Sequence, residues 1–126
     1  MYSKQELFDR VKGHLLYQNC RSCDDNDIPR YYGPWDSKCA MGCLIHGDFY
    51  DHRIEGIGVF LTGIRTEGTD VARLASALLK SGVNVDDEEI LSLCVDLQDC
   101  HDTLPPDRWY CELDAIARKH GLAFQL

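Results

Sequence analysis

Four segments of this sequence place apolar residues at the spacing of one helix face. They cover residues 4–18, 70–80, 87–101 and 106 to about 120. Apolar residues three and four positions apart lie on the same side of an α-helix, and that side must be buried against another element. The pattern predicts a mainly α protein with about four helices around one core.

Residues at the predicted helix ends support these bounds. Ser3 with Glu6, and Asp86 with Glu89, have the spacing of a capping box, in which side chains satisfy free N–H groups of the first turn. The other end signals are Thr69 as an N-cap, Gly82 and Gly121 as residues just past a C-terminus, and the Pro105-Pro106 pair. Each helix is therefore predicted from its ends as well as from its apolar face.

The rest of the chain is less regular. Residues 19–29 are rich in Asp and Asn, which favour surface turns. Two tyrosines followed by a Gly-Pro turn predict a small β-hairpin or irregular element near residues 28–45. Within that element residues 39–45 are apolar and slim, so we expect them to be buried. Three glycines in residues 54–64 leave strand, irregular chain and short helix open.

Length and charge bound the class of protein. A chain of 126 residues is sized for a single domain, residues 1–126. Its formal charge of −8 disfavours direct binding to nucleic acid and favours a partner with a basic surface. No apolar run is long enough to cross a membrane, and the first residues lack a signal-peptide core. We therefore expect a cytoplasmic protein that does not associate with membranes.

Two close cysteine pairs, separated by fifteen residues, have a spacing that suits a tetrahedral zinc site. The four candidate ligands are Cys20, Cys23, Cys39 and Cys43. His46 or His52 could take the place of one of these cysteines as a zinc ligand. The alternative is that these cysteines are reduced, apolar residues of the ordinary kind, and on that interpretation no cofactor is needed.

A second hypothesis makes Cys39 a catalytic thiol. If a helix begins at Cys39, its N-terminal dipole would lower the thiol pKa, and His101 would serve as the base. Asp102 is the remaining candidate, but adjacent side chains on a helix are expected to diverge, which leaves the base without an orienting group. The simpler interpretation is that His101 and Asp102 stabilise the end of their helix.

A third hypothesis concerns an aromatic segment. The candidate contact residues are Arg30, Tyr31, Tyr32 and Trp35, and arginine and aromatic side chains dominate protein interfaces. The alternative is that these rings cover the core beside the predicted hairpin. Trp109, at the start of the last helix, is expected to be a core residue because its partners at helical spacing are apolar.

The run Lys38-Cys39-Ala40-Met41-Gly42-Cys43-Leu44-Ile45, followed by Tyr50-Asp51 and Glu55-Gly56, resembles a group of small uncharacterised proteins from bacteriophages, prophages and their bacterial hosts. The likeness continues through Leu97-Gln98, His101-Asp102, Trp109, Leu113, Ile116-Ala117 and Gly121-Leu122. It implies a genetic setting and a location in the bacterial host cytosol, and it implies no catalytic residue.

These observations lead to an expected function. A phage-type accessory protein of this size is expected to bind and modulate a host protein without catalysis, and inhibition of bacterial immune machinery is the first case to test. The alternatives are a cysteine-dependent enzyme that uses Cys39 and His101, and an interaction module held together by zinc.

Overall fold

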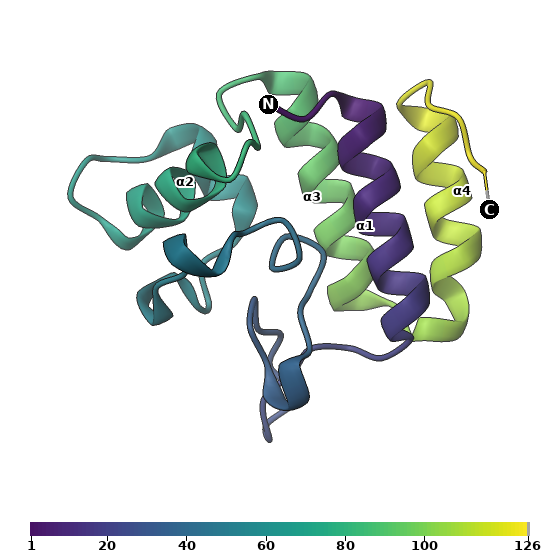
Figure 1. Cartoon of the computed structure of the whole chain (residues 1–126), viewed down its shortest axis with the longest axis horizontal. Helices are drawn as coiled ribbons and strands as arrows, with labels where there is room; N and C mark the ends of the chain where they lie inside the picture. Colours follow the sequence, from purple (N-terminus) through teal and green to yellow (C-terminus); the bar gives the residue numbers. More distant parts are fainter. Residues whose placement is uncertain (126) are drawn as a thin grey trace.

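Three of the four helices lie side by side in a layer (Figure 1). In the computed structural model, which describes residues 1–125, these are α1 (Lys4–Gln18), α3 (Glu88–Thr103) and α4 (Trp109–Lys119). The fourth helix, α2 (Asp70–Lys80), stands beside this layer, and one continuous cluster of buried apolar residues includes side chains from all four. The predicted mainly α fold is confirmed. No helix within residues 1–125 is long and apolar enough to span a membrane.

The helix ends follow the local sequence closely. The capping box of Ser3 and Glu6 is formed in both directions, and Thr69 caps α2. Gly82 and Gly121 have φ angles of 94° and 68°, a left-handed conformation that suits glycine just past a helix. The capping box predicted at Asp86 was wrong.

The N-cap of α3 is Asp87, one residue later than predicted. Its carboxylate accepts the backbone N–H groups of Glu89 and Ile90. Asp87 already satisfies two free donors of the first turn by itself, so the cap of α3 does not depend on a reciprocal bond from Glu89.

The segment after α1 is irregular and extends away from the helical layer, toward the bottom of Figure 1. The predicted hairpin is reduced to an isolated antiparallel bridge between Tyr32 and Lys38, which encloses the 3-10 turn Pro34–Asp36. Residues 39–45 form a turn in the core, as expected from their slim side chains. A Cβ at Gly42 would lie 2.0 Å from the carbonyl oxygen of Tyr31, so only glycine fits there.

The region between this turn and α2 contains three 3-10 helices joined by irregular chain, η2 (Gly47–Phe49), η3 (His52–Ile54) and η4 (Val59–Ile64). The sequence left strand, irregular chain and short helix open for residues 54–64, and the structure has a short helix there, η4. Both η3 and η4 pack against α2, and η4 also packs against α3. These short turns therefore connect α2 to the helical layer.

Candidate functional site

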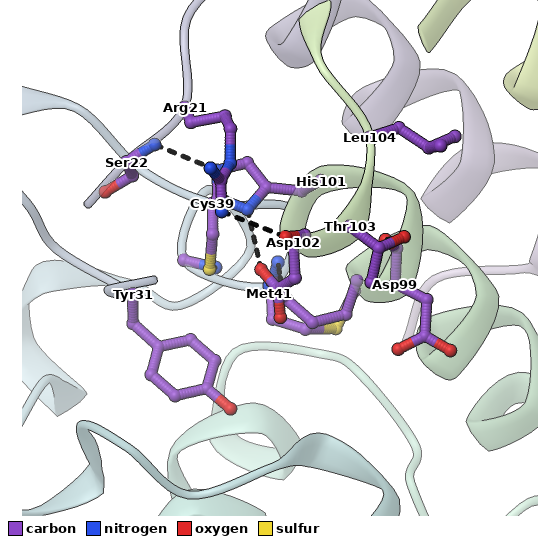
Figure 2. A network of polar contacts seen from close by, with 12 residues as sticks. Arg21, Ser22, Tyr31, Cys39, Met41, Asp99, His101, Asp102, Thr103 and Leu104 are labelled. Carbon is purple, nitrogen blue, oxygen red and sulfur yellow. Dashed lines mark hydrogen bonds and ion pairs between the residues drawn. The ribbon is translucent and has the colours of Figure 1, made fainter. Parts of the chain in front are cut away.

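Polar side chains at the end of α3 hold the irregular segment in place (Figure 2). His101 is fully buried, and its Nε2 accepts the backbone N–H of Ser22 at 2.9 Å. Its Nδ1 lies 2.7 Å from Oδ1 of Asp102, and Gln98 donates to the same oxygen at 2.7 Å. The side-chain oxygen Oε1 of Gln98 accepts the backbone N–H of Met41 at 3.0 Å. The network joins three segments that are far apart in the sequence.

These partners determine which ring nitrogen of His101 carries hydrogen. A backbone N–H can only donate, so Nε2 is an acceptor and Nδ1 carries the hydrogen that Asp102 accepts. The expectation that His101 and Asp102 diverge was wrong, because the Asp102 carboxylate lies between the imidazole and the Gln98 amide. Neither nitrogen is free to take a proton from a substrate without breaking one of these bonds.

Cys39 and Asp102 line one small cavity, and Asp102 is bonded to His101, so the three catalytic candidates are brought together (Figure 2). Cys39 is 1% exposed, and burial raises the pKa of its thiol far above the usual range. No helix begins at Cys39 to counter this effect with its dipole, contrary to the sequence hypothesis. The cavity of about 180 Å³ lined by Cys39, Gln98 and Asp102 is smaller than the roughly 300–1,000 Å³ of ordinary ligand pockets. The geometry is that of a structural cluster.

The cysteine pairs proposed as zinc ligands differ in their surroundings. Cys20 is exposed, Cys23 and Cys43 are half-buried, and Cys39 is buried. The substitutes His46 and His52 are both exposed. Within residues 1–125, no group of three or more His, Cys, Asp or Glu side chains is placed to hold a metal ion. All seven cysteines are free thiols.

The carboxylate of Glu55 organises most of the predicted aromatic contact segment. It accepts the backbone N–H groups of Tyr31 at 2.8 Å and Tyr32 at 3.1 Å, and it accepts the hydroxyl of Tyr50 at 2.7 Å. Arg30 lies 3.5 Å from it, as an ion pair. Tyr31 is buried, and Tyr32 stacks on Tyr50 with ring centroids 4.1 Å apart. These aromatic rings therefore support the fold.

Trp35 is the member of the predicted contact segment that projects freely, and it is 100% exposed. Its φ and ψ angles are 60° and 34°, and the next residue, Asp36, has a φ of 59°. This conformation costs a residue such as Trp35 roughly 1–2 kcal/mol, whereas Asp tolerates it better because its short polar side chain can hydrogen-bond locally. Strained backbone of this kind is concentrated at functional positions, and the strain here places a large apolar ring in solvent.

A groove of about 1020 Å³ lies between α1 and the irregular segment, and Trp35 is one of its lining residues. Arg10, His14 and Tyr17 line it from α1, at a spacing of four and then three residues. Residues that line it from the irregular segment include Tyr32, Lys38, Cys43 and Leu44. Tyr17 is 92% exposed, so two large aromatic side chains border the groove in solvent.

The contribution of α1 to this groove was not predicted from the sequence. Arg10, His14 and Tyr17 share one helix face because of their spacing, and an exposed aromatic residue on the polar side of an amphipathic helix was the available signal. Glu55 gave no signal, because the backbone groups that it holds, those of Tyr31 and Tyr32, lie 24 and 23 residues away along irregular chain.

Comparison with known proteins provides no further evidence on this site. No protein-family model matches the chain, and neither the curated proteins nor the solved structures contain a significant match.

Proposed function

We propose that this protein acts by binding a partner protein and modulating it, as an accessory protein of the phage type would act on a host protein. The observation that carries the proposal is Trp35, a fully exposed tryptophan held on strained backbone at the edge of a large groove. Tryptophan is among the residues that contribute most to protein interfaces. Inhibition of a bacterial immune component is the specific case that we would test first.

The buried cluster supports binding over catalysis. His101 uses both ring nitrogens in the fold, and Cys39 is inaccessible with a raised pKa. A thiol enzyme needs an accessible thiolate and a base that is free to exchange a proton. The candidate catalytic residues thus already have a structural role.

The charge of −8 bears on the kind of partner. Exposed acidic residues accelerate association with a basic protein, and salt screens this attraction over about 8 Å at physiological ionic strength. We propose a partner whose surface is basic overall. Binding to such a partner should weaken as the salt concentration rises.

Affinity capture from bacterial lysate, followed by titration of the purified partner, tests the proposal. Trp35→Ala should weaken binding by about fivefold or more, which corresponds to the ~1 kcal/mol threshold for interface residues that matter. Phe60→Ala is the matched control, because Phe60 is also exposed, at 62%, but does not line the groove. Equal loss in both variants, or catalytic turnover of a substrate without any stable complex, would contradict the proposal.

A further inference from the structure

The bond between His101 and Ser22 forms only while the imidazole is uncharged. Nε2 accepts the Ser22 N–H at 2.9 Å, and Nδ1 carries the hydrogen that Asp102 accepts at 2.7 Å. A histidine that takes up a second proton has a hydrogen on both ring nitrogens and no acceptor left, whichever way the ring is turned. Two N–H groups would then face each other at a site where both residues are fully buried. Relieving this conflict requires that Ser22 and the end of α3 separate.

A carboxylate on α3 favours a charged imidazole at this position. Asp102 already contacts the Nδ1 side of His101 at 2.7 Å, and an opposite charge at this distance stabilises an imidazolium. Asp99, three residues earlier, is a second acidic group at the same end of the helix (Figure 2). From α4 the neighbour is the uncharged ring of Trp109, at a centroid distance of 5.6 Å. The helical layer can therefore accommodate the charge.

The groups that face His101 from the other elements provide no negative charge. On the irregular segment, Arg21 is itself a cation and donates to the backbone at the end of α3 at 2.9 Å. Cys39 and Tyr31 are uncharged, because burial raises the pKa of both side chains. On α1, burial is the main cause of the lowered pKa of His14, and the charge of His101 adds to it. A proton on His101 is thus opposed from the side of the irregular segment.

Ser22 also supports the turn that carries Trp35. Its carbonyl accepts the backbone N–H of Arg30 at 2.9 Å, and its hydroxyl accepts that of Ser37 at 3.2 Å. The same hydroxyl packs so closely against Gly33 that a Cβ there would collide with it. Gly33 and Ser37 are the two ends of the turn, and the Gly33 N–H donates to the Ser37 carbonyl at 2.8 Å. A movement of Ser22 therefore affects both ends of the turn.

We propose that His101 is a pH-sensitive switch: when its Nε2 takes up a proton, residues 21–38 separate from the end of α3 and the turn that carries Trp35 is released. Separation takes the Arg21 cation away together with Ser22, and it lets water reach the imidazolium. Asp102 stays on α3 as the partner of the charged ring. This conformational change does not depend on the proposed function.

The size of the effect follows from proton linkage. A solvent-exposed imidazole takes up its second proton at a pH of about 6.5. The open form binds this proton and the closed form does not, so the closed form loses stability as the pH falls through that value. Between pH 7.5 and pH 5.5 the ratio of open to closed molecules should rise about tenfold.

Nuclear magnetic resonance of the full chain tests the switch. The hydrogen-exchange rate of the Ser22 amide, divided by the intrinsic exchange rate at each pH, gives the opening constant of its bond. We expect this constant to rise about tenfold from pH 7.5 to pH 5.5, and the constant of the Gly33 amide to rise by the same factor. The amide of Leu97, in the middle of α3, should not follow, which separates local opening from unfolding. The imidazole signals of His101 report its protonation in the same samples.

His101→Gln removes the titration and keeps the bonds. The glutamine oxygen can accept the Ser22 N–H, its amide can donate to Asp102, and it does not titrate, so the opening constant should be independent of pH. His14→Gln is the matched control and should keep the tenfold rise, because this half-buried histidine contacts the irregular segment through the Lys38 carbonyl, at 2.8 Å, and does not touch Ser22. If His101→Gln does not fold, the exchange rates of the natural protein still decide.

An opening constant at Ser22 that is the same at both pH values would overturn the inference. A charged His101 beside a Ser22 amide that stays protected would do so as well, as would an equal rise in His101→Gln or a rise that His14→Gln removes. If Ser22 opens and Gly33 does not, the turn that carries Trp35 is not coupled to the histidine. An equal rise at Leu97 would assign the effect to unfolding of the whole chain and reject the switch.

Discussion

The Nε2 atom of His101 accepts the backbone N–H of Ser22, 79 residues earlier in the chain, at 2.9 Å. Both residues are fully buried, so this bond joins the end of α3 to the irregular segment without help from water. The imidazole also stacks on the core residue Trp109, at a centroid distance of 5.6 Å. The histidine thus connects the helical layer to the segment that carries Trp35.

Replacing His101 with alanine should destabilise the protein by about 3 kcal/mol. The substitution leaves the buried Ser22 N–H without an acceptor, which costs roughly 1–3 kcal/mol, and it opens a cavity beside Trp109. Urea unfolding measures the loss. His52→Ala is the control, because an exposed histidine should change stability by no more than about 0.5 kcal/mol. A change of that small size at His101 would refute the structural role.

The helices could be predicted because their determinants are local. Ser3 and Glu6 are three residues apart, and Gly121 comes just after the C-cap of its helix, so short-range patterns are sufficient. The His101 to Ser22 bond has no such pattern, because a pairing over 79 residues depends on how the whole chain packs. The convergence of Cys39, His101 and Asp102 could be proposed as a hypothesis, but their burial could not be predicted.

The aromatic segment is a second case in which local sequence patterns could not predict burial. Tyr31 and Trp35 are close in sequence and similar in chemistry, yet one is 6% exposed and the other 100%. Glu55, next to a distant 3-10 helix, accepts the backbone N–H groups of Tyr31 and Tyr32, and the ring of Tyr31 belongs to the buried core. No property of the two aromatic residues distinguishes them before that contact is known.

Thiol labelling at neutral pH should separate the cysteines by accessibility. Cys20 and Cys111 are exposed and should react first. Burial raises the pKa of both Cys94 and Cys100 to about 12, and Cys39 is buried in the same way, so these three should react only after unfolding. Mass spectrometry after brief alkylation identifies the sites. Preferential early labelling of Cys39 would support the thiol-enzyme hypothesis instead.

Glu55→Ala should destabilise the protein by about 3 kcal/mol. It removes the acceptor for two backbone N–H groups and one tyrosine hydroxyl, and hydrogen bonds to a charged group contribute roughly 1.5–3 kcal/mol each without being additive. Glu55→Gln should cost less, since its amide retains one acceptor oxygen. Thermal or urea unfolding of both variants makes the comparison, and equal stability of Glu55→Ala and the natural protein would exclude this role.

Asp96 gives a prediction for pH. Burial raises its pKa, but hydrogen bonds from His120 at 2.7 Å and from Lys119 outweigh burial and leave the pKa lowered. A lowered carboxylate pKa contributes stability above the ordinary value of about 3.9, and the contribution is lost as the pH falls through the lowered pKa. Asp96→Asn should therefore destabilise the protein at pH 7. The difference from the natural protein should shrink steadily below about pH 4, as followed by urea unfolding, whereas a difference independent of pH would rule out the ion pair as its source.

Asp36 links the strain of the irregular segment to its proposed function. Its φ of 59° disfavours side chains with a Cβ but suits glycine, so Asp36→Gly should be more stable than Asp36→Ala by about 1 kcal/mol. Both variants lose the ion pair with Lys38, so the comparison isolates the backbone.

Partner binding should change in the opposite direction, because glycine frees the backbone that holds Trp35 in position and raises the entropic cost of ordering it. Unfolding curves and titration with the captured partner measure the two effects. If Asp36→Gly binds as tightly as the natural protein, the strained backbone does not prepare Trp35 for contact, and its conformation serves only the turn.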